Sequence, residues 1–169
     1  MSEAGRGATE SPVDEDRLDG WKLEGLDFPS FRISLLAKVM DRLTNRTLAE
    51  NSEISITEWR VLTRLTLLPE GLTVRQIAMR AWVDRAEVSR AASSLEARGL
   101  ISRRENPADR RSPILTVTPA GKKLYKPIMK LRTAFHARIM QNLSGQEIEH
   151  LDELLTKLAH NLLEMTDES

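Results

Sequence analysis

Apolar residues recur every three or four positions along most of the chain beyond residue 30, the spacing that places side chains on one face of an α-helix. The first series predicts a helix over residues 30–50, and its members are Phe31, Leu35, Val39 and Leu43. A second helix is predicted over residues 55–68, because Ser55 and Glu58 form a capping box and Pro69 interrupts the pattern. The pattern therefore predicts a mainly helical chain.

Residues 73–98 have the pattern of two short helices joined by a turn at residues 81–83. Thr73 and Asp84 stand at the two helix starts, each followed three positions later by a glutamine or a glutamate, and Gly99 ends the second helix. Four residues on one face of the second helix should be buried: Val88, Ala91, Ala92 and Leu95. Five should point outwards: Arg85, Ala86, Ser89, Arg90 and Ser93.

The outward set of this second helix suits the major groove of DNA. Arginine can form two hydrogen bonds with guanine, serine can bond to a base edge or a phosphate, and alanine can touch a thymine methyl group. An ordinary solvated helix can have the same composition. The helix alone therefore does not decide between a DNA-reading surface and a solvated one.

Two short segments compatible with β-structure follow, at residues 100–103 and 114–118. The ten residues between them are polar and contain two prolines and three arginines. This composition predicts a β-hairpin with a basic tip.

Two more helices are predicted at the C-terminal end, one from Pro119 to about Leu143 and one that starts at the capping box Ser144–Glu147. Apolar residues of the last helix alternate spacings of three and four, which is a short heptad seam: Ile148, Leu151, Leu155, Leu158, Leu162 and Met165. Such a seam packs either inside its own subunit or against a second chain. We favour a second chain, because few elements remain in this chain to cover the seam.

Charge is unevenly distributed, although the formal net charge is zero. Residues 1–30 hold three basic and eight acidic side chains, and residues 141–169 hold one and seven. Residues 73–140 hold fifteen basic and five acidic side chains, a net charge of +10. The predicted helix pair and hairpin thus lie in a positive field flanked by acidic ends, which favours a nucleic-acid partner.

The strings Val83–Ala91 and Leu95–Arg103 resemble the recognition helix and first wing strand of the MarR family of bacterial winged-helix regulators. Asn106–Arg111 and Leu115–Gly121 resemble the wing tip of that family and the start of its next helix. The helical framework extends the resemblance over residues 30–166. Trp82 departs from it, because many members have a glycine in this turn.

The resemblance implies a winged helix-turn-helix domain at residues 55–118 and a helical dimerisation region made of residues 30–54 and 119–166. Residues 1–29 lie outside the resemblance, and their acidic composition without periodicity predicts a mobile tail, with an arm that crosses the dimer as the alternative. The implied assembly is a homodimer on double-stranded DNA. The residues that it places in the major groove are Arg85, Ala86, Ser89, Arg90 and Ser93. In the wing, Arg111 would enter the minor groove with Asp109 holding it, and Arg104 and Arg110 would lie near phosphates.

The resemblance also implies a small-molecule effector, often an aromatic acid, bound between the dimer helices and the DNA-binding lobe. Arg32, Trp59, Arg60 and His136 are the candidate ligand-binding residues, since an arginine beside an aromatic ring can bind the carboxylate of such a ligand. Trp59 could equally be a core residue and Arg60 a surface charge. The three histidines lack the spacing of metal ligands, so we expect no metal and no cofactor.

These observations predict a sequence-specific, DNA-binding transcriptional regulator, most simply a homodimeric repressor that a small ligand releases from a pseudo-palindromic operator. The alternative is a winged-helix module that binds a protein partner, or binds DNA without sequence preference. An enzyme is not predicted, because we find no cysteine, glycine-rich phosphate loop or recognisable catalytic arrangement. The chain has no apolar run of membrane-spanning length and no secretion signal, so we expect a cytoplasmic protein without membrane contact.

Overall fold

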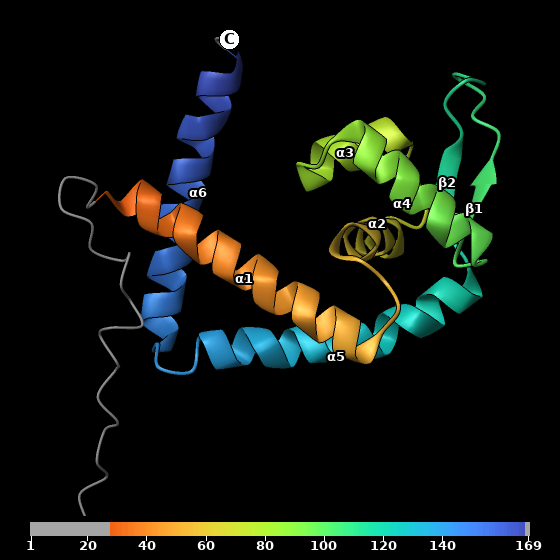
Figure 1. Cartoon of the computed structure of the whole chain (residues 1–169). Coiled ribbons are helices and arrows are strands. Elements are labelled where there is room, and N and C mark those ends of the chain that lie inside the picture. The colour runs from red at the N-terminus through yellow and green to blue at the C-terminus, as the bar shows by residue number, and fades with distance from the viewer. Residues whose placement is uncertain (1–27, 168–169) are drawn as a thin grey trace, which may run out of the picture. The chain divides into compact units, whose positions relative to one another are not determined.

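The structure is a computed structural model that describes residues 28–167 of the 169-residue chain (Figure 1). The predicted tail over residues 1–29 lies almost wholly outside this range. Contacts divide the chain into two compact units, Met1–Ile56 and Thr57–Ser169. Over the described residues the elements follow in the order α1, α2, α3, α4, β1, β2, α5 and α6. The prediction of a mainly helical fold with one small hairpin is confirmed.

The first unit contains helix α1 (Pro29–Asn51), within one residue of its predicted bounds. Pro29 occupies the first helical position, where its missing amide hydrogen is not needed. The helix ends where the Ser52 amide donates to the Leu48 carbonyl oxygen at 2.8 Å. Five apolar side chains of α1 remain between 39% and 47% exposed: Ile33, Leu36, Val39, Met40 and Leu43. By itself, α1 therefore presents an apolar stripe.

The second unit begins with three helices, α2 (Ile56–Leu67), α3 (Val74–Ala81) and α4 (Arg85–Ala97). The capping box predicted at the start of α3 is present: the Gln76 amide donates to the Thr73 hydroxyl at 3.2 Å, and the Thr73 amide donates to the Gln76 side chain at 2.9 Å. Side chains from all three helices are completely buried and form the core: Leu62, Leu65, Ile77, Val88 and Leu95.

Strands β1 (Ile101–Arg104) and β2 (Ile114–Val117) form an antiparallel hairpin, with β1 starting one residue later than predicted. Leu72, just before α3, adds a short third pairing that the sequence did not reveal. Its amide donates to the Leu115 carbonyl oxygen at 3.0 Å, and the Leu115 amide donates back at 2.8 Å. Because these bonds join the loop before α3 to β2, the hairpin is fixed to the helix pair through strand β2.

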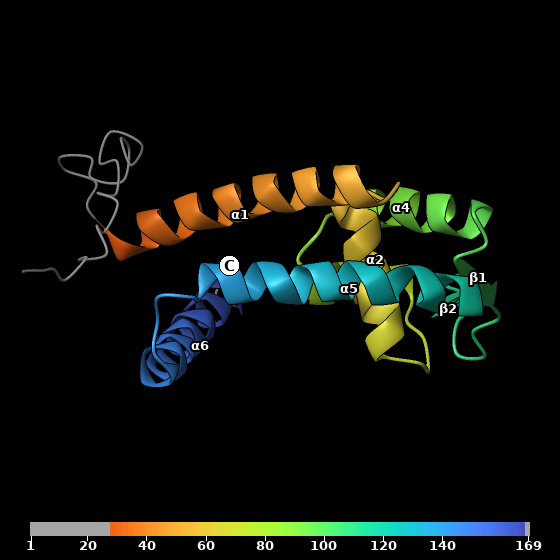
Figure 2. The ribbon, with the colours of Figure 1, turned by 90° about the horizontal axis from the view of Figure 1, so that it is seen from below.

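Helix α5 (Pro119–Ile139) follows β2, and α6 (Gly145–Asp167) turns away from its far end, as both views show (Figure 2). The capping box predicted at Ser144 is present, and bonds from the Ser144 amide and hydroxyl, both at 2.7 Å, lower the pKa of Glu147. Apolar side chains on α6 remain at least 42% exposed: Leu154, Leu155, Leu158, Leu162, Leu163 and Met165. Over residues 28–167, no helix is both long and apolar enough to cross a membrane.

Candidate nucleic-acid interface

Helix α4 has the two faces that its sequence predicted. Its apolar stripe is buried, with Val88, Ala92 and Leu95 fully covered and Ala91 at 7% exposure. The predicted outward residues are all exposed: Arg85, Ala86, Ser89, Arg90 and Ser93. The Asp84 carboxylate fixes the start of the helix by accepting from the amides of Ala86 at 2.8 Å and Glu87 at 3.1 Å. The exposed face of α4 therefore begins in its first turn, and its side chains are accessible to a partner.

Side chains from the start of α2 hold α4 in place. The Thr57 hydroxyl donates to the Glu87 carboxylate, a bond that draws Glu87 away from the capping role predicted for it. Glu58, only 7% exposed, accepts from the Ser94 hydroxyl at 2.7 Å and lies 3.7 Å from an Arg98 guanidinium nitrogen. A buried carboxylate is tolerated only where hydrogen bonds and charge compensate it. No local sequence pattern predicts these contacts between α2 and α4.

Arg103 on β1 connects α4 to the hairpin. Its guanidinium donates to the Glu96 carboxylate at 2.7 Å and to the Ser93 hydroxyl at 3.3 Å. Ser93, predicted as a groove residue, therefore uses its oxygen as an acceptor towards the wing strand and keeps its own hydrogen for another partner. These bonds join α4 to the wing, and the Leu72 pairing joins the wing to the loop before α3.

The basic residues of the wing have different surroundings. Arg104 donates to the Glu70 carbonyl oxygen at 2.7 Å, which ties β1 to the loop before α3. Arg110 pairs with Glu105 at 2.9 Å, but both side chains are more than two-thirds exposed, so the pair adds little stability and can exchange partners. Arg111 is exposed at the tip.

Local hydrogen bonds shape the tip of the hairpin. The Asp109 carboxylate accepts from the Arg111 amide at 3.0 Å, so it holds the backbone from which the Arg111 side chain projects. The Asn106 side chain accepts from the Ala108 amide at 3.1 Å and donates to the Ser112 carbonyl oxygen at 3.0 Å. Short side chains that bond to nearby backbone in this way form stable turns. The tip therefore presents Arg111 from an ordered loop.

The four candidate ligand-binding residues do not form one cluster within the second unit. Trp59 is 7% exposed and stacks on Tyr125, with ring centroids 5.2 Å apart, so it is part of the packing between α2 and α5. Arg60 follows it and is half-buried, whereas His136 is exposed. His136 lies eleven residues along α5 from Tyr125, about 16 Å at 1.5 Å per residue. Arg32 lies near the start of α1, in the first unit.

Comparison with known proteins agrees with this geometry. A sequence model described as MarR family matches residues 52–112, which include α2, α3, α4 and the hairpin up to its tip. In the crystal structure of the transcriptional regulator SlyA, the chain is 27% identical in sequence to this one. The two superpose with a TM-score of 0.70, and the match covers 78% of this chain and 92% of that one.

Two further solved structures share the fold at lower identity. MepR of S. aureus, in complex with DNA, is 23% identical with a TM-score of 0.70, over 80% of this chain and 96% of that one. PcaV of Streptomyces coelicolor, in complex with its natural ligand, is 22% identical with a TM-score of 0.68, over 82% of this chain and 96% of that one. Residues 52–112 of this chain thus match the MarR family model, and α3, α4 and the hairpin have the arrangement of the DNA-binding fold found in transcriptional regulators such as SlyA.

Proposed function

We propose that this protein is a sequence-specific transcriptional repressor that binds a pseudo-palindromic operator as a homodimer and is released by a small ligand. The observation that carries the proposal is the exposed face of α4, where two arginines lie among short side chains beside a hairpin with a basic tip. A face of this kind can read base edges without steric conflict. A protein partner would instead favour an apolar anchor at this position.

The proposed major-groove contacts are the outward residues of α4: Arg85, Ala86, Ser89, Arg90 and Ser93. Arg90, in the second turn, is the candidate for a two-bond contact with guanine. In the wing, Arg111 is proposed to enter the minor groove, where a narrow A·T-rich groove concentrates negative potential. Arg110 and Arg104 are proposed to lie near phosphates, with Asp109 shaping the tip that carries them.

Exposed apolar residues support the homodimer. Helices α1 and α6 together leave eleven large apolar side chains at least 39% exposed, more than a soluble monomer usually tolerates. Burying such surfaces against a second copy is the simplest solution, and two-fold symmetry follows for most homodimers. Two recognition helices on one face of DNA would then read half-sites about 10 bp apart.

Release by a ligand requires that the ligand prefer a state that does not fit the operator, because equal affinity for both states shifts nothing. The structure of PcaV with its natural ligand supports a small-molecule effector for this fold. The proposed site of action is the cytoplasm, where such a regulator meets both DNA and metabolites.

The decisive experiment selects duplexes from a random pool with the purified full-length protein, at two salt concentrations and against excess unrelated DNA. We expect an inverted repeat bound about 10³-fold or more tightly than random duplex. Weak binding that falls steeply with salt and enriches no sequence would refute sequence-specific regulation and leave only electrostatic contact with DNA. No binding to any duplex would favour the protein-partner alternative.

A further inference from the structure

Trp82, in the turn between α3 and α4, has an environment that core packing does not explain. Its backbone is left-handed, with φ 52° and ψ 47°, a conformation that costs free energy for any residue with a Cβ atom. The side chain is nevertheless a large indole that is 74% exposed, and Met79, three positions earlier, is 64% exposed. Both side chains line one pocket, so they form a single exposed apolar patch on the DNA-binding lobe.

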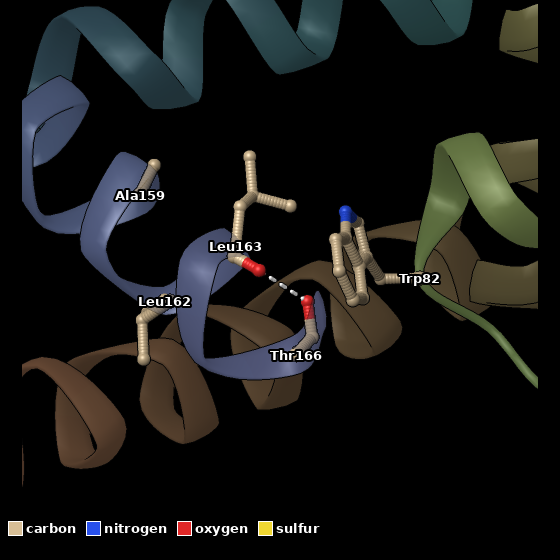
Figure 3. A pocket seen from close by; sticks show the side chains of 5 residues that line it. All are labelled: Trp82, Ala159, Leu162, Leu163 and Thr166. Atoms are coloured by element: carbon tan, nitrogen blue, oxygen red, sulfur yellow. Dashed lines mark hydrogen bonds between the residues drawn. The ribbon is translucent and has the colours of Figure 1, made fainter. Parts of the chain in front are cut away.

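This patch belongs to a groove between α3 and the last turns of α6. One pocket of about 550 Å³ has Trp82, Met79 and Leu163 in its walls, and a second of about 430 Å³ adjoins it and shares Trp82 and Leu163. Figure 3 shows the indole facing α6, where the Thr166 hydroxyl donates to the Leu163 carbonyl oxygen at 2.7 Å. We call the two pockets together the Trp82 groove. Protein partners fill such pockets with large apolar side chains.

Two arginines give the Trp82 groove a positive charge. Arg75 on α3 and Arg85 at the start of α4 both line it, and none of the described residues in its walls is acidic. Among the residues that the structure describes, neither arginine has a hydrogen bond or an ion pair. Arginine forms paired hydrogen bonds with carboxylates. The groove is therefore complementary to a chain segment that combines carboxylates with large apolar side chains.

A segment of this composition lies just before α1. Residues 14–27 contain six acidic and two basic side chains, a net charge of −4. Four large apolar residues lie among these charges: Leu18, Trp21, Leu23 and Leu26. The net charge of residues 73–140, which include α3 and α4, is +10. Both the charge and the apolar side chains of residues 14–27 thus match the groove.

We propose that residues 14–27 of a second copy of the chain dock in the Trp82 groove. Trp21 is the apolar anchor and stacks on Trp82, and the carboxylates of the segment accept hydrogen bonds from Arg75 and Arg85. The segment leads into α1, whose apolar stripe is part of the proposed dimer surface, so a second copy is close to its end. This inference rests on the proposed homodimer, and it explains why an exposed indole occupies a strained turn.

Docking of the segment competes with DNA. Arg85 is both a wall of the groove and a proposed major-groove contact, so a carboxylate bound to Arg85 removes a positive charge from the DNA-reading face. Only lobes with an empty groove bind DNA, and the apparent affinity for DNA falls in proportion to their fraction. The acidic segment therefore sets the threshold of DNA concentration at which the protein binds.

Position-specific crosslinking tests the docking, because the chain contains no cysteine. Full-length Gly20→Cys and Thr166→Cys proteins are co-expressed and oxidised, and mass spectrometry measures the disulfide between positions 20 and 166, which in this mixture forms only between two copies. It should form at least about tenfold faster than the disulfide between Gly20→Cys and Leu67→Cys, because docking raises the local concentration. Leu67 is 62% exposed and does not line the groove.

Equal rates at positions 166 and 67 would overturn the proposal. The rival occupant is the same segment of the same chain. If the disulfide formed in a protein that contains both Gly20→Cys and Thr166→Cys, but never in the mixture, the assignment to a second copy would be wrong.

Variants of the groove test its recognition of the segment. Trp82→Gly removes the indole and suits the left-handed turn, so the lobe should remain folded. Trp82→Gly, Trp21→Ala and Arg75→Gln should each slow the crosslink about fivefold or more, because each removes a ring contact or a charged hydrogen bond. Arg80→Gln, at an exposed position of α3 outside the groove, should leave the rate unchanged. Unchanged rates in all three groove and segment variants would overturn the proposal.

Competition with DNA is measured by fluorescence anisotropy on a random-sequence duplex. One full-length variant neutralises three acidic residues of the segment: Asp14→Asn, Glu15→Gln and Asp16→Asn. It should bind the duplex about tenfold more tightly than the parent, the gain expected when a segment that fills most grooves is released. The control removes the same charge from α6: Glu149→Gln, Asp152→Asn and Glu153→Gln. Equal gains in the two variants would reduce the effect to net charge and overturn the competition.

Failure of the proposed function has a different signature. If the parent enriched no operator but its crosslink still depended on Trp82 and Arg75, the regulator would be refuted and the docking supported. A specific operator bound by a protein without the preferential crosslink would support the regulator and refute the docking.

Discussion

Removing either of two arginines from the proposed DNA interface should weaken DNA binding in a different way. Arg90 lies on α4 among short side chains, and Arg111 lies at the hairpin tip, where Asp109 holds its backbone. Arg90→Ala should cost about 1–3 kcal/mol on the selected operator and relax preference inside the half-site. Arg111→Ala should weaken binding, reduce its salt dependence and remove the preference for A·T-rich flanks. Fluorescence anisotropy with systematically varied duplexes measures both changes.

A control variant tests whether the loss of any exposed positive charge has the same effect on DNA binding. Arg138, an exposed residue near the end of α5, is outside the proposed interface, and Arg138→Ala should bind every duplex like the parent protein. The assignment of the reading surface would be wrong if Arg90→Ala and Arg111→Ala also behaved like the parent.

Gly121 is required by the close packing of α5 against the loop before β1. A Cβ atom at this position would lie 2.1 Å from the Leu100 carbonyl oxygen and 2.8 Å from a Val117 methyl group. Gly121→Ala should therefore lower the free energy of unfolding by about 1–3 kcal/mol or more, the cost of overpacking against backbone that cannot move aside. Urea denaturation followed by circular dichroism measures the loss.

The matched change is Gly145→Ala at the start of α6, where an added Cβ atom meets nothing within 4 Å. This variant should be as stable as the parent or more stable by about 0.5–1 kcal/mol, because alanine loses less backbone entropy than glycine on folding. Equal destabilisation by both changes would contradict the steric explanation for Gly121.

At the scale of elements, the position of α4 depends on Glu58 at the start of α2. Removing this buried carboxylate leaves the Ser94 hydroxyl and the Arg98 guanidinium without their shared partner. Glu58→Ala should lower the free energy of unfolding by about 1–3 kcal/mol. Below its melting temperature, the variant should also bind the operator more weakly without a change of base preference, because α4 is displaced but its side chains are intact.

Thermal denaturation and operator titration at a temperature where both proteins are folded separate these two effects. Glu70→Ala is the control, because Glu70 contributes its backbone carbonyl rather than its exposed carboxylate to Arg104. If folded Glu58→Ala bound the operator with unchanged affinity, the rest of the core would position α4 without the contacts of Glu58.

The elements that the sequence predicted correctly are those with a local signal. The stripe on α4 follows helical periodicity, and the starts of α3 and α6 follow from capping residues three positions apart. Longer-range ties were not predictable, because nothing in the local pattern joins Glu58 to Ser94, 36 positions away. For the same reason, the sequence pattern did not predict the stacking of Trp59 on Tyr125 or the pairing of Leu72 with Leu115.

At the scale of the whole molecule, the seam on α6 should determine the oligomeric state. Leu158 and Leu162 are 42% and 63% exposed, and a charge placed among them cannot be buried against a second copy without a large desolvation cost. Leu158→Glu should therefore produce monomers at concentrations where the parent is dimeric, as sedimentation equilibrium measures. Its affinity for a two-half-site operator should fall steeply, because each lobe would bind one half-site alone.

His160→Glu provides the control on the same helix. His160 is exposed and lies on the side of the helix opposite the seam, so an added charge there remains in water. It should leave the dimer intact. A dimer that persists in Leu158→Glu would place the interface elsewhere and would remove the main support for the two-fold operator.

The bonds from Arg103 to Ser93 and Glu96, with the pairing of Leu72 to β2, have a consequence for the DNA that such a lobe can accept. They hold α4 and the hairpin in a fixed relative position. The base pairs that α4 would read in the major groove and the flank that the hairpin would read in the minor groove must therefore keep a constant separation and rotation along the DNA. One extra base pair between them would rotate the flank by about a tenth of a turn and move it about 3.4 Å along the axis. The spacing inside each half-site of the proposed operator would therefore be set by this lobe, whereas the spacing between half-sites would be set by the proposed dimer.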